Sequence, residues 1–169
     1  MKKMIHIVTV LFSGLIAGLL FSYACSVNLG LHHLGDVEYV KAMQGINIEI
    51  QNFYFFTVFM GLLFLLPVSA WLSFSSVHKA TFYLWLTATI IYLFGVLGIT
   101  LVGNVPLNNQ MAVINLSSVN SETLSAFRHH FESQWTSYHM IRTVASIISF
   151  ILTIIGVVCG RHHSALQNG

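Results

Sequence analysis

The chain has 169 residues, of which 56% are hydrophobic and only 7% are charged, and its formal net charge at pH 7 is +2. A soluble domain carries about 25% charged residues, so this chain has too little charge to cover a surface that faces water. The small net charge and the lack of a basic stripe argue against nucleic acid as a partner. The length suits one domain, which we place at residues 1–169.

Four stretches contain no Asp, Glu, Lys or Arg over the roughly 20 residues that a helix needs to cross a bilayer. They cover residues 4–35, 50–78, 80–121 and 143–160. Since unpaired backbone groups cannot face lipid, each span should be helical. We therefore predict an all-α fold, an integral membrane four-helix bundle, with spans at about 5–31, 50–75, 80–104 and 136–160.

Residues 1–26 also have features of a secretory signal peptide, namely two lysines, an apolar run and small residues. Ser22 and Tyr23 fit a lipoprotein cleavage site before Cys25 poorly, and the apolar run continues to Leu31. We predict an uncleaved first helix, with a cleaved signal peptide as the alternative.

The segment before the second span favours a helix that projects beyond the membrane. Two sets of residues repeat there at intervals of three and four, the apolar Val37, Val40 and Met43 and the polar Gln44, Asn47 and Gln51. The polar set would share one face of the helix. Asp36 is a favourable N-cap residue, and we expect the helix that it starts to continue into the second span.

The third span should break or kink at Pro106, which restricts Val105 away from helical geometry. After a polar loop, Leu124, Phe127 and Phe131 repeat at helical intervals. We expect a helix capped by Ser121 to run into the fourth span. Helices two and four would thus both extend beyond the membrane on its non-cytoplasmic side.

Basic residues orient the bundle. Four of them lie at the chain ends or between the second and third spans: Lys2, Lys3, Lys79 and Arg161. The positive-inside rule then places both termini in the cytoplasm, and in a bacterium the two longer loops would face the periplasm. The expected location is a bacterial inner membrane, with membrane lipid as one partner.

Polar residues from all four helices fall at one predicted level, toward the non-cytoplasmic side. They are Asn28, His32, His33, Gln44, Asn47, Glu49, Gln51, Asn52, Asn104, Asn108, Asn109, Trp135, His139 and Arg142. Trp135, His139 and Arg142 are spaced so that they share one helical face. Polar residues at membrane depth face a bundle interior or a wet cavity, which favours a polar pocket at this end.

Arg142 is the single charged residue inside a predicted span and needs hydrogen-bond acceptors. Asn104 and Asn108 are the expected acceptors, and Glu49 is the nearest candidate counter-ion. The alternative is structural: Arg142 extends to the interface, and the amides join the helices.

A metal site is a further alternative. His32, His33, His139, Glu49 and the pair His129–His130 are residues of metal-ligating type that could meet at this level. No spacing typical of a metal motif is present, so a metal site is not favoured and none is predicted.

Three stretches together resemble the anthrone oxygenase-like family of small four-helix membrane proteins. They are "AMQGINIEIQNFYF" at 42–55, "GNVPLNNQMA" at 103–112 and "WTSYHMIRTVAS" at 135–146. The family's recurring polar positions are matched by Gln44, Asn47, Asn52, Asn104, Pro106, Asn108, Trp135, Arg142 and Thr143. Where the bacterial pattern has Trp-Asn before the arginine, this chain has Tyr138-His139.

Fungal members of the family oxidise anthrones to anthraquinones with dioxygen. If the family's chemistry applies to this chain, we expect His139, which departs from the family pattern, to be the base that removes a C–H proton, because its unperturbed pKa suits neutral pH. It also implies that Arg142 and Asn108 stabilise the enolate oxygen. The implied substrate-binding residues are Gln44, Asn47, Asn52, Asn104, Trp135 and Tyr138, of which the last two would stack on a flat ring.

Two functions are therefore expected from different classes. The first is a cofactor-independent oxygenase or oxidoreductase that acts on a hydrophobic aromatic or quinone-like molecule. The alternative is a non-catalytic protein that binds a lipid or small molecule, or a subunit of a membrane assembly. A channel or transporter is less favoured because the polar residues cluster at one end. The sequence does not predict the oligomeric state.

Overall fold

A computed structural model describes the backbone of residues 2–74 and 79–166, and side chains up to residue 160. Within these ranges every regular element is helical, as predicted. Four helices are long and apolar enough to cross a membrane: Lys2–His32, Phe53–Phe74, Lys79–Ala112 and Ser121–Gly160. The protein is an all-α bundle with four candidate membrane spans.

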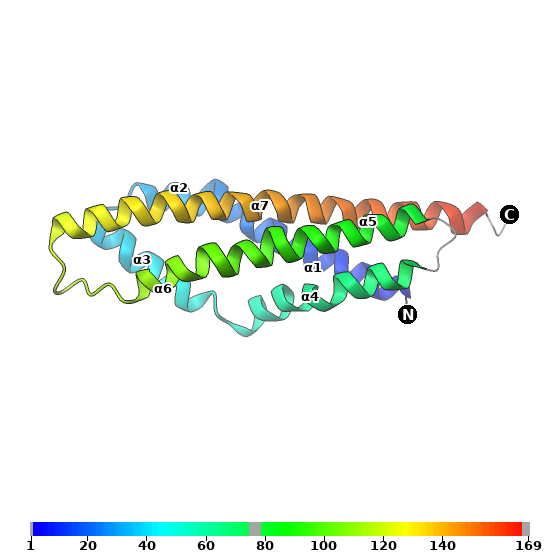
Figure 1. Ribbon diagram of the computed structural model, residues 1–169, viewed down its shortest axis with the longest axis horizontal. Helices are drawn as coiled ribbons and strands as arrows, with labels where there is room; N and C mark the ends of the chain where they lie inside the picture. The colour runs from blue at the N-terminus through cyan, green and yellow to red at the C-terminus, as the bar shows by residue number, and fades with distance from the viewer. Residues whose placement is uncertain (1, 75–78, 167–169) are drawn as a thin grey trace.

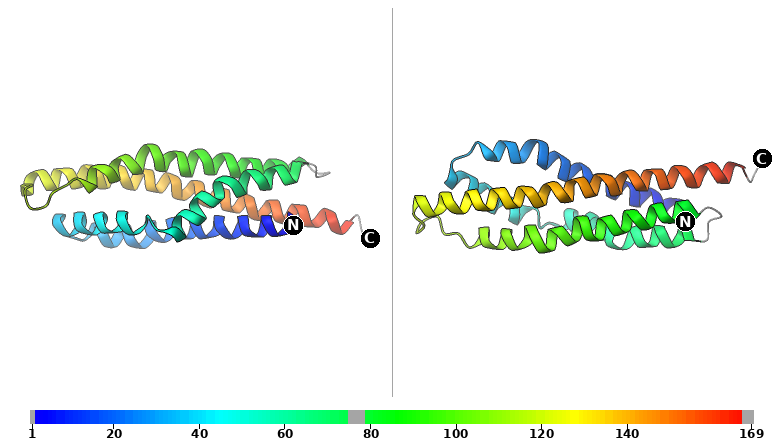
Figure 2. Two further views of the ribbon diagram at one scale, coloured as in Figure 1. Left: turned by 90° about the horizontal axis from the view of Figure 1, so that it is seen from below. Right: turned by 45° about the horizontal axis from the view of Figure 1, so that its top comes forward.

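The bundle is built from α1 (Lys2–Ser22), α4 (Phe53–Phe74), α5 (Lys79–Ile90) and α7 (Ser121–Leu166). Both α1 and α5 contact α4 and α7, so the four helices form a closed ring of neighbours. Figure 1 shows that α1 begins and α7 ends at the same end of the bundle. We call the opposite end, formed by residues 33–35 and 113–120, the loop end. The left view of Figure 2 shows α4 at an angle to the other long helices.

Two of the four spans contain π-helical turns. The first helix passes through η1 (Tyr23–Val27) into α2 (Asn28–His32), and the third passes from α5 through η2 (Ile91–Gly98) and η3 (Thr100–Asn104) into α6 (Val105–Ala112). At the last junction the amide of Val105 donates to the carbonyl of Thr100, five residues back. Such turns widen the helix locally and are frequent at functional sites.

The prediction for Pro106 was a break or a kink, and a break is not found, because the third helix runs on to Ala112. Pro106 lies in the first turn of α6, directly after the π-helical η3. Proline has no backbone N–H, so one hydrogen bond of the helix is missing at Pro106. The shift from α-helical to π-helical hydrogen bonding at η3 accommodates that loss.

The second helix is interrupted, contrary to the prediction. Helix α3 (Asp36–Glu49) ends before Asn52, and α4 starts at Phe53. The side chain of Asn52 accepts a hydrogen bond from the amide of Phe55 (3.0 Å) and donates to the carbonyl of Glu49 (2.7 Å). Asparagine competes with the helical ladder in this way, so it ends one helix and caps the next.

The two predicted N-caps were each wrong by one residue. Gly35 precedes α3, and Asp36 is its first residue. Asn120 caps α7, since its side-chain oxygen accepts a hydrogen bond from the amide of Thr123 at 2.8 Å. The prediction of one helix from the loop end through the fourth span is confirmed, because α7 is continuous over 46 residues.

Candidate functional site

His139 lies on α7 in the interior of the bundle and is only 1% exposed. Its Nε2 atom is 3.1 Å from the carbonyl oxygen of Leu20, and Nε and Nη2 of Arg142 lie 3.2 and 3.0 Å from its Nδ1 atom. Arginine is only a donor, so Nδ1 accepts and Nε2–H donates to Leu20. These partners fix one neutral tautomer of the ring.

The partner on the first helix lies where the backbone register changes. Leu20 comes shortly before the π-helical η1 (Tyr23–Val27). A change from α-helical to π-helical register shifts the backbone donors relative to their carbonyls. His139 therefore joins α7 to the first helix at a point where the helical ladder is altered.

Arg142 does not use the partners predicted for it. Besides His139, its hydrogen-bond acceptor is Oγ1 of Thr100 at 3.4 Å. Its guanidinium carbon also lies 5.4 Å from the centre of the Trp135 ring. None of the ion pairs in the described part of the chain includes Arg142. A guanidinium at membrane depth is thus held by neutral groups.

The asparagines predicted to bind Arg142 instead hold Trp135. Oδ1 of Asn108 accepts a hydrogen bond from the indole Nε1 at 2.8 Å, and Nδ2 of Asn104 donates to the carbonyl of Trp135 at 3.3 Å. Glu49, the predicted counter-ion, is exposed. The amides therefore fix the indole, and the indole supports the site from one side.

Four rings form a column along α7, spaced four residues apart. Phe127, Phe131, Trp135 and His139 follow one another with ring-centre distances of 5.9, 6.4 and 4.9 Å. The planes of Trp135 and His139 differ by only 9°. This stacking leaves the imidazole little freedom to turn.

His139 and Arg142 line a cavity of ≈ 260 Å³. Its polar lining is Tyr23, Asn47, Gln51, Thr100, Asn108, Asn109, Trp135, His139 and Arg142. The apolar lining includes Phe55 and Phe59, and also Leu101, which is 55% exposed on the side of the bundle. Exposed side chains within a candidate span face the region that lipid would occupy. Because Leu101 both lines the cavity and is exposed, we infer that this cavity with a polar wall opens toward the side of the bundle.

A second hollow of ≈ 590 Å³ adjoins this cavity at the loop end. The two share Asn47, Gln51, Asn108 and Asn109. Helix α3 lines one side of the hollow, and α6 with residues 113–117 lines the other. We call it the outer hollow.

The structure brings together five of the nine predicted site residues around the cavity: His139, Arg142, Asn108, Asn47 and Trp135. The other four lie elsewhere. Gln44 lines the outer hollow, Asn52 caps α4, Asn104 is buried against Trp135, and Tyr138 packs on Gly103.

Sequence reasoning missed two residues of the cavity wall. The hydroxyl of Tyr23 donates toward the sulfur of Met43, and its ring lies 5.1 Å from that of His139. Thr100 is the acceptor for Arg142. A tyrosine and a threonine within apolar helices were available signals, but each is common in membrane spans.

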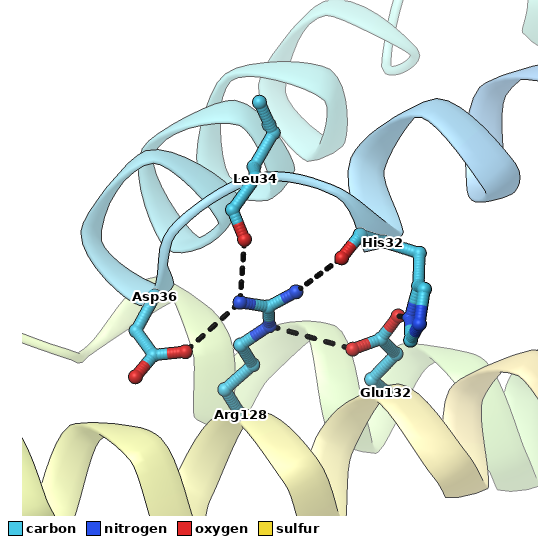
Figure 3. A network of polar contacts seen from close by, with 5 residues as sticks. All are labelled: His32, Leu34, Asp36, Arg128 and Glu132. Atoms are coloured by element: carbon cyan, nitrogen blue, oxygen red, sulfur yellow. Dashed lines mark hydrogen bonds and ion pairs between the residues drawn. The ribbon is translucent and has the colours of Figure 1, made fainter.

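A separate polar cluster, shown in Figure 3, surrounds Arg128 at the loop end. The guanidinium donates to the carbonyls of Leu34 and His32 (2.6 and 2.9 Å) and pairs with Asp36 at 2.9 Å. It also pairs with Glu132 at 3.4 Å, and Arg128 is only 8% exposed. This cluster ties the turn between α2 and α3 to α7.

The cluster shifts the ionisation of its neighbours outside the spans. The hydrogen bond from Arg128 holds the pKa of Asp36 below its ordinary value. Burial, and then the charge of Glu132, raises the pKa of Tyr39, over whose ring the Arg128 guanidinium lies at 4.6 Å. Asp36 therefore carries its charge, and Tyr39 is neutral, at ordinary pH.

The side chains considered for a metal are not brought together. Among the described residues, no three His, Cys, Asp or Glu side chains form a group that could hold a metal ion. His32 instead pairs with Glu132 at 2.8 Å.

The chain matches the family described as Anthrone oxygenase over residues 54–152, more than half of its length. The chain belongs to this family. The matched region includes the cavity residues Asn108, Trp135, His139 and Arg142, whereas Asn47 precedes it. No curated protein and no solved structure matches the chain.

Proposed function

We propose that the protein is a membrane-embedded, anthrone oxygenase-like enzyme that oxidises a flat, hydrophobic ring ketone with dioxygen. The observation that carries this proposal is the Arg142–His139 pair in the wall of a cavity that opens to the side of the bundle. Family membership supports the reaction class.

The cavity supports a small, lipid-soluble substrate. Its volume of ≈ 260 Å³ is just below the range of about 300–1,000 Å³ that is usual for ligand sites, which limits the occupant to two or three rings. Phe55 and Phe59 stack on each other in its wall and offer an aromatic surface. A substrate dissolved in the bilayer would enter past Leu101.

The first step is removal of a proton from the methylene that lies opposite the ring carbonyl of an anthrone. Arg142 turns an N–H toward the carbonyl oxygen and stabilises the enolate as it forms. This turn uncovers Nδ1 of His139, which accepts the methylene proton. Asn108, also in the cavity wall, is placed to donate a second hydrogen bond from its side-chain nitrogen.

The enolate then gives two electrons to dioxygen, and a C–O bond forms at the former methylene. The peroxide takes the proton back from His139. Loss of the second hydrogen as a proton, with cleavage of the O–O bond, yields the second carbonyl and one water. One substrate and one dioxygen give one quinone and one water, so the balance needs no other reductant.

The test is turnover of anthrone by the protein purified into nanodiscs, with oxygen uptake and quinone absorbance followed together. We expect one quinone per dioxygen at a rate above uncatalysed autoxidation. His139→Asn should lower the rate by about 10²-fold or more, which is the usual contribution of a general base. A wild-type rate equal to autoxidation would overturn the proposal.

The second candidate, a non-catalytic binding protein, is favoured by one observation. Both ring nitrogens of His139 already have protein partners, as in a structural histidine. In that case the protein should bind the aromatic ligand without turnover, and His139→Asn, which introduces the amide usual in the family, should leave that binding unchanged.

The charge distribution supports a bacterial inner membrane with both chain ends in the cytoplasm. Lys2, Lys3 and Lys79 belong to the end of the bundle opposite the loop end. The part of the chain toward the loop end carries two basic residues, Lys41 and Arg128, against four toward the other end: Lys2, Lys3, Lys79 and Arg161. Cysteine labelling of single-cysteine variants from each side of sealed vesicles would test it.

A further inference from the structure

We call the cavity of ≈ 260 Å³ that His139 and Arg142 line the inner cavity. The outer hollow differs from it in chemistry as well as in position. Its lining contains no charged residue and six amide side chains: Gln44, Asn47, Gln51, Asn108, Asn109 and Asn115. Amides both donate and accept hydrogen bonds, which suits hydroxyl groups. Without a cation or an anion, the wall offers no counter-ion to a phosphate, a carboxylate or an ammonium group.

The shape of the outer hollow is held by the protein itself. Nε2 of Gln44 donates to the carbonyls of Met111 and Ile114, both at 3.0 Å, and so fixes the far rim to α3. The side chain of Asn115 is likewise held within its own loop, because its oxygen accepts a hydrogen bond from the amide of Ser117 at 3.0 Å. A ligand would therefore meet a wall that is already formed.

Asn47 lies where the hollow meets the inner cavity and lines both. Its Nδ2 atom is buried and has no hydrogen-bond partner among the described residues. A buried donor without a partner is costly, so this amide is suited to a ligand that supplies an acceptor.

We propose that the outer hollow binds an uncharged, hydroxyl-rich group, such as a glycosyl unit, attached to one end of the ring substrate, and that Asn47 selects for it. This inference rests on the proposed function, which places the rings of the substrate in the inner cavity. The hollow, at ≈ 590 Å³, is larger than the cavity of ≈ 260 Å³ assigned to the rings, so it has room for more than a ring hydroxyl. Its place at the loop end, beyond the lateral opening, suits a group that prefers water to lipid.

The test compares the binding of three probes to the protein in phosphatidylcholine nanodiscs, free of glycoside detergent: a hydroxyanthraquinone, its O-glucoside, and anthraquinone-2-sulfonate. We expect the glucoside to bind most tightly. Asn47→Leu should lower the ratio of glucoside to aglycone affinity by about 3- to 10-fold, the effect of one neutral hydrogen bond.

Asn28→Leu is the matched control, because Nδ2 of Asn28 is also buried and has no partner in the part of the chain that the structure describes, but Asn28 lines neither space. Asn109→Leu is a second test variant at an exposed position, where substitution should not affect folding, and it should weaken the preference in the same direction.

Equal binding of glucoside and aglycone, or a preference that survives in Asn47→Leu, would overturn the inference. Tightest binding of the sulfonate would overturn it too. If octyl glucoside displaces the aromatic glucoside at equal concentration, the hollow binds a sugar that is carried by a lipid. That result would overturn the proposal that the sugar is attached to the ring substrate. Anthrone turnover is measured separately, so a failure of the proposed reaction is distinguished from a failure of this subsite.

Discussion

Arg142 donates two hydrogen bonds to a single atom of His139, since its Nε and Nη2 atoms lie 3.2 and 3.0 Å from Nδ1. The nitrogen that would serve as a base is thus covered by a cation. In the proposed reaction, substrate binding draws Arg142 away and uncovers the base, so binding and deprotonation are coupled through this pair.

This coupling predicts that Arg142→Lys impairs turnover even though it keeps the charge. Lysine has one nitrogen in place of a planar fork, so it cannot serve both His139 and the substrate oxygen in the same way. We expect kcat to fall about 10²- to 10³-fold, as for loss of an oxyanion donor, with a smaller change in KM. Steady-state oxygen uptake measures both constants, and an unchanged kcat would contradict the role of Arg142.

The lateral opening of the cavity gives a second prediction. Leu101 lines the cavity at the side of the bundle, so Leu101→Trp should narrow the opening and lower kcat/KM several-fold. The control is Val102→Trp, because Val102 is 71% exposed and does not line the cavity. Equal effects of the two variants on kcat/KM would argue against access from the bilayer.

The hydrogen bonds around Arg128 should stabilise the fold, so we expect substitution of Arg128 to lower the stability of the protein. Arg128→Met leaves the carbonyls of His32 and Leu34 without their donor, and we expect a cost of about 1–3 kcal/mol in the free energy of unfolding. Thermal unfolding in detergent measures the change as a lower midpoint. Lys41→Met, at an exposed basic residue of α3, is the control and should shift the midpoint little. Similar midpoints for both variants would mean that the cluster adds no stability.

The same cluster predicts a dependence of stability on pH. The pKa of Asp36 is lower in the folded protein than its ordinary value of 3.8, so its stabilising effect is complete above that value. The effect is lost as pH falls below 3.8 through the folded-state pKa. Asp36→Asn should therefore lower the unfolding midpoint at pH 6 and have less effect at pH 3. If Asp36→Asn lowers the unfolding midpoint by the same amount at pH 6 and pH 3, the ion pair with Arg128 is not the cause of the pH dependence.

Close packing at Gly103 gives the last prediction. A Cβ atom there would lie 2.6 Å from Cγ of Tyr138, so Gly103→Ala must displace that ring or the backbone. We expect a loss of about 1–3 kcal/mol, the usual cost of overpacking. Gly18→Ala is the control, since a Cβ atom at Gly18 would meet nothing within 4 Å. Unfolding midpoints that fall equally in both variants would contradict this account of the packing.

Much of the architecture could be predicted because it depends on local composition. Long uncharged segments define the four spans, and the repeat of Leu124, Phe127 and Phe131 predicted the extension of α7. The prediction that Trp135, His139 and Arg142 share a face also follows from spacing alone. All three line the same cavity.

Local details were less predictable because alternatives of nearly equal energy compete. Asn52 ends one helix and caps the next, whereas its sequence context allows a continuous helix. Pro106 should have broken the third helix, but the π-helical η3 accommodates it. Both outcomes depend on where neighbouring helices hold the backbone.

The sequence by itself determined that this chain forms four long apolar helices with its polar residues toward one end, because the length and polarity of each segment decide whether it can lie in lipid. Only the tertiary structure decided the partners of those polar residues. Arg142 bonds to His139 and Thr100, although Asn108 was an equally good acceptor by composition. Hydrogen bonds require donors and acceptors within about 3 Å, and that distance is set by how the helices pack, which spacing along one helix does not specify.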